Sequence, residues 1–237
     1  MRKLLNKVSL ITGAGRGRGR GVAIAMAKAG SSVVLVSRTL IELEETARII
    51  TESGGTALPV KTDISDEKQV NTMIEKALDR FGKIDILVNN AGNFLEKAII
   101  DTTLEDWDTI MGTNLKGMFL CTKAVLKGMI ERKSGTIINF SSIGGRIGLK
   151  GKSIYSASKF GVIGFSKALA KELKPYHIKV HIIYPNMVDS NNSIDWSKDN
   201  PLNINSVNDI ADIIIYLSSL PLRVNIEDII VDPYIQG

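Results

Sequence analysis

The chain has few of the residues that mark secreted, membrane-spanning or unstructured proteins. Among its 237 residues there is a single cysteine, Cys121, which excludes a disulfide within the chain and fits a reducing compartment. No apolar run approaches the roughly 18 residues that span a bilayer. The apolar run near the N-terminus is too short for a signal peptide. We therefore expect a cytoplasmic protein without a membrane partner.

Low-complexity and metal-binding patterns are also scarce. The sequence holds 21 glycines, 6 prolines and 44% hydrophobic residues, which excludes collagen-like and disordered chains. Its two histidines, His177 and His181, are interpreted as structural or exposed. No cluster of His, Cys or carboxylates has metal-ligand spacing, so no metal is expected. Without a linker or repeat, residues 1–237 are expected to form a single domain.

Positive charge exceeds negative charge, with 30 Lys and Arg against 25 Asp and Glu. Such an excess fits nucleic acid, an acidic protein or an anionic small molecule as partner. No aromatic-rich sheet face or recognition-helix pattern accompanies it, so we expect no nucleic-acid partner. The positions of the arginines must decide between the other two.

Short β-rich runs alternate with helical patterns along the whole chain. Most of these runs are nearly continuous apolar stretches, as expected for strands covered on both faces. The repetition predicts an α/β fold, a Rossmann-like doubly wound parallel sheet of about seven strands with helices on both faces. The expected strands are residues 8–12, 32–37, 57–61, 84–89, 136–140, 179–183 and 229–231. Helical patterns cover residues 70–81, 115–129, 154–174 and 207–217.

A glycine-rich turn links the first expected strand to the first helix. Gly13, Gly17 and Gly19 follow a G-x-x-x-G-x-G spacing, with Gly15 and Arg16 between them. Glycines allow positive φ and close backbone approach, and a helix N-terminus attracts phosphate. The turn therefore predicts a cofactor pyrophosphate site. An ordinary strand-to-helix turn is the alternative.

The second expected strand ends at Ser37 and Arg38, where a cofactor with a free ribose 2′-hydroxyl usually meets a carboxylate. No carboxylate stands there. Arg38 and Arg16 instead favour a 2′-phosphate through charge-assisted hydrogen bonds. The expected cofactor is NADP(H), and the alternative is a pair of solvated arginines at a helix entrance.

Tyr155 and Lys159 are four residues apart on an expected helix, so their side chains share one face. A free tyrosine has a pKa near 10, and a neighbouring ammonium would favour its phenolate. That would bring Tyr155 within range for general acid and base work. Ser142 follows the fifth expected strand, at the edge where open α/β sheets bind ligands, and could hydrogen-bond a substrate carbonyl.

Taken together, these motifs resemble the short-chain dehydrogenase/reductase family over roughly residues 5 to 190. The overall pattern is most similar to 3-oxoacyl-[acyl-carrier-protein] reductases. The resemblance implies that Tyr155 is the catalytic acid or base and that Ser142 orients and polarises the carbonyl. Lys159 would bind the nicotinamide ribose and lower the tyrosine pKa, and Asn114 would hold a water in a proton relay. The remaining cofactor contacts that it implies are Asp63 and Ile64 at the adenine, Asn90, Ala91 and Gly92 along the cleft, and Pro185, Val188 and Ser190 after the sixth strand.

Three departures from the family pattern stand out. Arg18 replaces the usual aliphatic residue of the glycine turn, so its side chain is expected to reach solvent or phosphate rather than pack inward. Asn186 replaces the usual glycine after Pro185, and asparagine tolerates the left-handed conformation. The C-terminus lacks the frequent closing Asp-Gly-Gly, which weakens the expectation of a last strand and of the tetramer built around it.

The sequence thus predicts an NADP(H)-dependent oxidoreductase that transfers hydride between the nicotinamide and a carbonyl or alcohol. A 3-oxoacyl thioester of fatty acid biosynthesis, carried on an acidic acyl-carrier protein, is one candidate substrate, and sugars or small ketones are others. A catalytically silent nucleotide-binding regulator is the alternative class. A short lid is expected at 186–206, with Trp196 as its large anchor and a surface loop as the alternative. Helix faces at 115–129 and 154–173 predict a homodimer or homotetramer, unless they only pack on the sheet.

Overall fold

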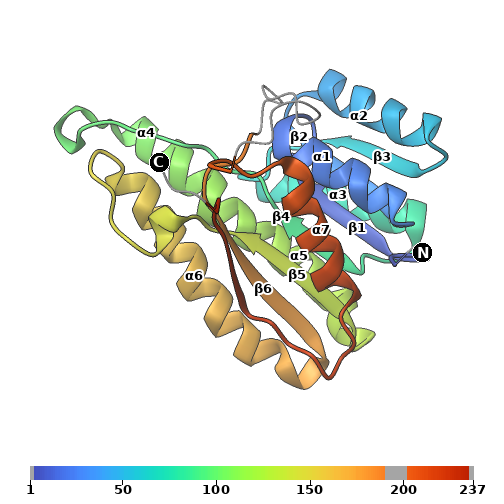
Figure 1. Ribbon diagram of the computed structural model, residues 1–237. Coiled ribbons are helices and arrows are strands. Elements are labelled where there is room, and N and C mark those ends of the chain that lie inside the picture. The colour runs from blue at the N-terminus through green and yellow to red at the C-terminus, as the bar shows by residue number, and fades with distance from the viewer. Residues whose placement is uncertain (1–2, 190–201, 235–237) are drawn as a thin grey trace.

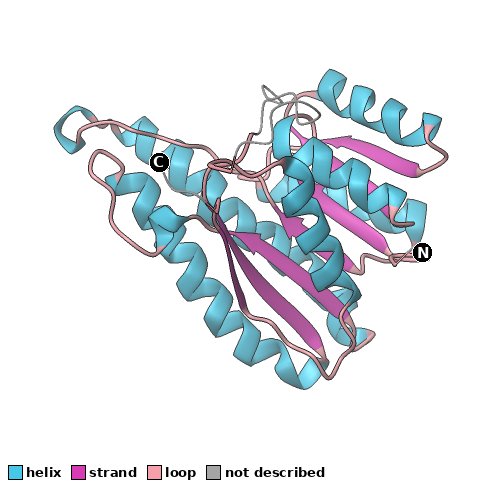
Figure 2. Cartoon of the chain, viewed as in Figure 1, coloured by secondary structure: helices cyan, strands magenta, loops and turns pink. Residues whose placement is uncertain are grey.

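The computed structural model describes residues 3–189 and 202–234. Within them, seven strands form one parallel sheet in the order β3-β2-β1-β4-β5-β6-β7, with helices on both faces (Figures 1 and 2). This arrangement confirms the predicted Rossmann-like fold. The strands are β1 (Val8–Thr12), β2 (Ser32–Ser37), β3 (Thr56–Lys61), β4 (Ile86–Asn89), β5 (Gly135–Phe140), β6 (Ile178–Pro185) and β7 (Asp228–Val231).

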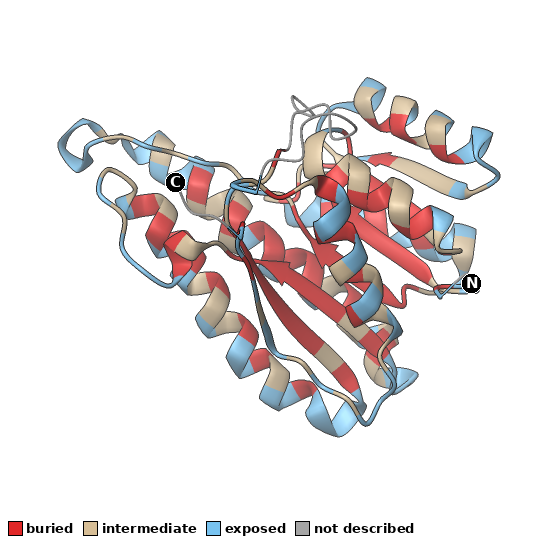
Figure 3. Cartoon of the chain, viewed as in Figure 1, coloured by how far each residue is buried: buried red, intermediate tan, exposed pale blue. Residues whose placement is uncertain are grey.

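Two apolar clusters, one on each face, hold the helices to the sheet. Helices α1, α2 and α7 pack in one cluster, and α3, α5 and α6 pack in the other. The central strands are buried along most of their length, because helices cover both of their faces (Figure 3). The helices are α1 (Gly17–Lys28), α2 (Leu40–Glu52), α3 (Glu67–Phe81), α4 (Leu104–Met111), α5 (Met118–Glu131), α6 (Ser153–Leu173) and α7 (Val207–Ser219).

The strand order fixes where a ligand can bind. β1 lies between β2 and β4: the chain builds β2 and β3 outward on one side of β1 and then crosses after β3 to β4 on the other side. In open parallel sheets a crevice forms outside the carboxyl ends of the strands at such a switch point. The glycine turn after β1 and the segment after β4 therefore meet at one edge of the sheet.

One local feature differs from the sequence expectations, and the last expected strand is confirmed. A π-helical turn at Gly112–Gly117 joins α4 to α5, so the helical pattern at 115–129 begins in a wider turn that carries Asn114. β7 forms and pairs in parallel with β6 although the closing Asp-Gly-Gly is missing.

No helix among residues 3–189 and 202–234 is both long and apolar enough to cross a membrane.

Candidate active site

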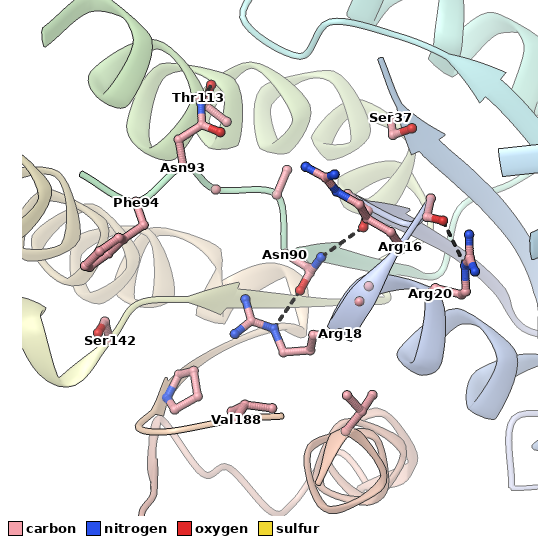
Figure 4. A pocket seen from close by; sticks show the side chains of 18 of the residues that line it. Arg16, Arg18, Arg20, Ser37, Asn90, Asn93, Phe94, Thr113, Ser142 and Val188 are labelled. Atoms are coloured by element: carbon pink, nitrogen blue, oxygen red, sulfur yellow. Dashed lines mark hydrogen bonds between the residues drawn. The ribbon is translucent and has the colours of Figure 1, made fainter. Parts of the chain in front are cut away.

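A cleft of about 1520 Å³ opens over the carboxyl ends of the central strands. Its walls come from the glycine turn, the ends of β2, β4, β5 and β6, and the start of α6 (Figure 4). The volume exceeds the usual range for one small ligand, which suits a dinucleotide with a substrate beside it. The predicted site residues that line it are Gly13, Gly15, Arg16, Gly17, Gly19, Ser37, Arg38, Asp63, Ile64, Asn90, Ala91, Gly92, Ser142, Tyr155, Lys159, Pro185 and Val188.

The glycine turn is packed too closely for side chains. Gly13 has a φ of +69°, and a Cβ added to it would lie 2.9 Å from Nδ2 of Asn90. A Cβ on Gly19 would lie 2.0 Å from the carbonyl oxygen of Gly13. Because backbone fills this space, Gly13 and Gly19 are required by the turn itself, and the cleft wall there is bare backbone.

The N-terminus of α1 faces the same cleft, and no side chain caps it. Its N-cap, Arg16, makes no side-chain cap hydrogen bond, and the first turn holds no acidic residue. By contrast, Asp66, Thr103 and Ser206 cap α3, α4 and α7. An uncapped N-terminus beside bare glycine backbone suits a pyrophosphate, because it presents unpaired N–H groups and partial positive charge.

Thr12, which the sequence reading did not single out as a site residue, ties β1 to the segment after β4. Its Oγ1 accepts hydrogen bonds from the backbone nitrogens of Asn90 and Ala91, at 3.1 and 3.0 Å. Asn90 Nδ2 in turn donates to the carbonyl oxygen of Thr12 at 2.9 Å. These bonds hold both sides of the crevice in register.

Arg18 does not project into solvent, contrary to the sequence expectation. Its Nε donates to Oδ1 of Asn90 at 2.8 Å, and its Cζ lies 4.2 Å from the ring centroid of Phe140. Burial lowers the pKa of Arg18 to about 10. The side chain packs inward because the phenylalanine face and the asparagine amide offer it a cation–π contact and a hydrogen bond.

The rim at the end of β2 carries opposite charges. Arg38 is exposed and lines the cleft, as expected for a group that meets a 2′-phosphate. Glu42 of α2, which sequence reasoning missed, also lines the cleft, and its Oε2 lies 2.9 Å from where a Gly15 Cβ would stand. A motif at the end of β2 could not have identified Glu42 as a cleft residue, because Glu42 lies in α2 and reaches the glycine turn only through the packing of that helix.

Asp63, which is predicted to meet the adenine, lines the cleft and also forms hydrogen bonds within its own loop. Its Oδ1 accepts hydrogen bonds from the backbone nitrogen and the hydroxyl of Ser65, at 2.9 and 2.7 Å. Ile64 beside it is buried and packs against Gly117, where a Cβ would lie 2.7 Å from Ile64 Cγ1. The two residues therefore shape this wall before any ligand binds.

Tyr155 and Lys159 lie on one face of α6, as predicted. Lys159 Nζ is 5.8 Å from the ring centroid of Tyr155 and donates to the carbonyl oxygen of Phe140 at 3.0 Å. The ring of Phe94 meets that of Tyr155 edge to face, with centroids 5.1 Å apart. Lys159 is buried, while Tyr155 remains partly exposed to the cleft.

Burial lowers the pKa of Lys159 to about 7, and the nearby Arg18 guanidinium contributes to the lowering. Desolvation disfavours the ammonium, and no Asp or Glu forms an ion pair with Lys159 in the described part of the chain. Lys159 is therefore close to its point of titration at neutral pH, whereas Arg18 keeps its charge.

Ser142 stands at the mouth of the cleft just beyond β5. Its backbone is extended, and its Oγ accepts a hydrogen bond from the backbone nitrogen of Gly144 at 3.2 Å. That bond leaves the hydroxyl hydrogen available to a substrate oxygen. Ser141 beside it has a structural role, because its Oγ donates to the carbonyl oxygen of Lys159 at 3.0 Å.

Asn114 lies behind the cleft wall rather than on it. Its Nδ2 donates to the carbonyl oxygen of Asn93 at 2.9 Å and to Oγ of Ser158 at 3.0 Å, and its Oδ1 accepts from Asn93 N at 2.7 Å. A Cβ on Gly92 would lie 3.2 Å from Asn114 Oδ1 and 3.5 Å from Lys159 Nζ. The π-helical turn thus places Asn114 next to the lysine, with only a glycine between them.

After β6 the chain returns along the cleft. Pro185 and Val188 line it, and Val188 forms a parallel bridge with Asn205. Asn186 has no positive φ, so the left-handed tolerance of asparagine is not what this position uses. The predicted contact Ser190 and the anchor Trp196 lie outside the described residues.

Other sequence expectations concern histidine and metals. His181 is buried in β6, with Nδ1 hydrogen-bonded to the carbonyl oxygen of Ile226, while His177 ends a short turn with a φ of +58°. Among residues 3–189 and 202–234, no group of three His, Cys, Asp or Glu could hold a metal ion.

The parallel sheet, the glycine turn at its switch point and the tyrosine and lysine beside it define a nicotinamide-dependent oxidoreductase. The family model for short chain dehydrogenases matches residues 7–201. The chain belongs to this family.

Named relatives agree with the assignment. A 3-oxoacyl-[acyl-carrier-protein] reductase of Synechocystis is 40% identical over 79% of this chain and 76% of its own length. An uncharacterized oxidoreductase of Staphylococcus aureus is 34% identical over 98% of this chain and its full length. Among solved structures, a metagenomic short-chain oxidoreductase in complex with NADP is 28% identical, covers 99% of this chain and 100% of its own, and has a TM-score of 0.87. A short-chain dehydrogenase/reductase of Mycobacterium marinum is 33% identical, with a TM-score of 0.88 over 98% of this chain and 96% of its own.

Proposed function

We propose that the protein is an NADP(H)-dependent carbonyl reductase whose acid and base is Tyr155. The observation that carries the proposal is the meeting of two sets of residues in one cleft. Ser142, Tyr155 and Lys159 line it together with the uncapped glycine turn. A dinucleotide bound to the turn would extend toward the tyrosine.

The bound nicotinamide would supply the hydride in reduction and accept it in oxidation. Ser142 donates a hydrogen bond to the carbonyl oxygen and stabilises the negative charge that develops there. Tyr155 gives that oxygen its proton. Lys159, with its Nζ 5.8 Å from the Tyr155 ring centroid, is the group that can return a proton to the tyrosine, and Asn114 on the other side of Gly92 would position a water for that transfer.

Two arginines support NADP(H) over NAD(H). Arg16 and Arg38 are exposed at the rim where a 2′-phosphate would lie, and neither side chain is engaged by a carboxylate within the described residues. A solved relative carries NADP. Glu42 favours the second candidate, NAD(H), because a carboxylate beside Gly15 and Ser37 can accept a hydrogen bond from a free ribose hydroxyl. Because the two cations outnumber the one anion at this rim, we propose NADP(H).

A 3-oxoacyl thioester is the substrate that we propose to test first. The Synechocystis relative is named for that activity, and Lys123, Lys127 and Lys171 are exposed cations that could meet an acidic carrier protein. We also propose a homodimer or homotetramer, since Leu104, Trp107 and Phe160 expose apolar side chains on α4 and α6. Sugars and small ketones are the competing substrates.

A substrate panel tests the proposal directly. The purified protein is mixed with NADPH or NADH and with 3-oxoacyl thioesters, diketones or sugars, and cofactor oxidation is followed by absorbance. We expect turnover with NADPH and a ketone, highest with the thioesters. Binding of nucleotide without turnover of any carbonyl would instead favour the silent regulatory protein. A preference for NADH would overturn the cofactor assignment alone.

A further inference from the structure

Arg18 occupies a position inside the cleft that the proposed chemistry has not yet used. It lies between Gly17 and Gly19 at the start of α1, and Figure 4 shows it reaching toward Asn90 and the Ser142 side of the pocket. Arg20, in contrast, lies toward Ser37 and donates from Nε to the carbonyl oxygen of Gly15 at 2.9 Å. The two arginines therefore serve different ends of the cleft.

The guanidinium of Arg18 is held firmly at the catalytic end. Its Nε donates to Asn90 Oδ1 at 2.8 Å, and its Cζ lies 4.2 Å from the Phe140 ring centroid. The carbonyl oxygen of the same Phe140 accepts the hydrogen bond from Lys159 Nζ. Asn90 is itself held by a hydrogen bond to the carbonyl oxygen of Thr12. Arg18 therefore contacts two residues, Asn90 and Phe140, that other interactions already position.

The guanidinium of Arg18 is charged at neutral pH. Even with burial, its pKa stays near 10, well above neutrality. Among the described residues, no carboxylate forms an ion pair with it. A cation in the cleft wall that has no carboxylate partner among the described residues acts on any ligand charge brought beside it.

We propose that Arg18 makes this cleft distinguish the redox state of the nicotinamide, binding the neutral reduced ring more tightly than the positively charged oxidised ring. This inference rests on the proposed function. A hydride can reach a carbonyl held by Ser142 and Tyr155 only from a ring beside them, and Arg18 lines the same cleft, with its guanidinium over the ring of Phe140.

The two redox forms differ by one positive charge on the ring and are otherwise alike. Contacts to the phosphates and the adenine, including those of Arg16 and Arg38, therefore affect both forms equally. A fixed cation beside the ring would repel only the oxidised form, and at the effective dielectric of a protein site such repulsion amounts to about tenfold in affinity or more. The protein would therefore take up NADPH in preference to NADP⁺ and release the oxidised cofactor readily.

A rival role for Arg18 leads to a different result. If the side chain bound the cofactor pyrophosphate, its loss would weaken both redox forms by the same factor. The ratio of the two dissociation constants therefore separates selection of the redox state from simple phosphate binding.

Calorimetric titration of the full-length protein with NADPH and with NADP⁺ measures that ratio without turnover. For the wild type we expect NADPH to bind about tenfold more tightly than NADP⁺. Arg18→Met, which keeps an unbranched side chain against Phe140 but no charge, should reduce the ratio about fivefold or more, chiefly by tightening NADP⁺. Arg18→Lys, which keeps the charge, should retain most of the ratio.

Lys28→Met is the matched control, because it removes one exposed positive charge from the last turn of the same helix. It should leave both dissociation constants unchanged. If Arg18→Met does not fold, Arg18→Gln gives the same comparison and can still hydrogen-bond Asn90. An unchanged ratio in the neutral variants, or equal binding of both forms by the wild type, would overturn the role of Arg18 alone. Failure of both nucleotides to bind the wild type would overturn the proposed function, and the inference with it.

Discussion

The two ends of the cleft are built in different ways. At the catalytic end, Lys159 and Asn114 are buried and hydrogen-bonded to Phe140, Asn93 and Ser158. At the rim beyond β2, Arg16 and Arg38 are exposed and make no side-chain hydrogen bond to another described residue. Hydrogen bonds to the protein thus fix Lys159 and Asn114, whereas none within the described residues fixes the side chains of Arg16 and Arg38.

This difference matches the demands on each end. Catalysis needs donors and charges held in place before the reaction, because reorganising them would add to the barrier. A phosphate can be bound by flexible cations that close around it. Because these side chains lose conformational entropy when they become ordered, the net binding free energy is smaller. We therefore expect large effects from substitutions at the catalytic end and modest, selective effects at the rim.

Tyr155→Phe should have the largest effect. The phenyl ring can keep its contact with Phe94, but the proton donor is gone. We expect kcat to fall by about a thousandfold or more, in line with losses of a general acid and base, while the NADPH dissociation constant stays the same. Steady-state kinetics and calorimetry measure the two quantities. Tyr216→Phe, on the exposed face of α7, is the control and should behave as wild type. Full turnover in Tyr155→Phe would refute the role of the tyrosine.

Ser142→Ala should come next. Removing one hydrogen-bond donor from a developing oxyanion typically lowers kcat by about a hundredfold to a thousandfold. Because the Ser142 hydroxyl bonds only Gly144 N within the described chain, the fold should tolerate the change. The measurement is kcat and KM for the best ketone of the panel, with exposed Ser153→Ala as the control. A variant that raised KM but kept kcat would place Ser142 in ground-state binding instead.

The catalytic end also differs from the rim in how its stability depends on pH. Lys159 has its pKa lowered to about 7 by burial, against about 10.4 in an unfolded chain. Between these values the unfolded protein binds more protons, so this group makes the free energy of unfolding rise with pH. From pH 7 to pH 9 the rise amounts to about 2 kcal/mol. Below pH 7 the lysine is charged in both states, and its contribution no longer changes.

Urea unfolding at a series of pH values tests this. Between pH 7 and pH 9 the unfolding free energy of the wild type should rise by about 2 kcal/mol relative to that of Lys159→Met. Lys127→Met, on an exposed part of α5, should run parallel to the wild type over that range. Parallel curves for Lys159→Met would show that the buried lysine keeps its proton.

Most of the fold could be predicted because its signals are local. Continuous apolar runs identified all seven strands of the described sheet, and the glycine spacing placed the turn after β1. The pair of Tyr155 and Lys159 was predictable because helical geometry alone puts residues four apart on one face. Each of these features depends on neighbours within one element.

Features that depend on distant segments were not predictable in the same way. The inward turn of Arg18 requires Phe140 and Asn90, which come from β5 and the segment after β4. Glu42 reaches the glycine turn only because α2 packs back across β2. The π-helical turn around Asn114 has no local motif, since its residues also fit an ordinary helix.

The smallest effects are expected at the rim, and they should have opposite signs. Arg38→Gln removes a cation that would meet a 2′-phosphate, so kcat/KM for NADPH should fall about tenfold, with that for NADH nearly unchanged. Glu42→Gln removes the competing carboxylate, so NADPH should gain about threefold while NADH loses. Arg48→Gln, on the same helix but paired with Glu45 and Glu52, is the control and should leave the ratio of the two cofactors unaltered. Equal losses for both cofactors in Arg38→Gln would mean that the rim serves the fold rather than the phosphate, and the contrast between the two ends would then disappear.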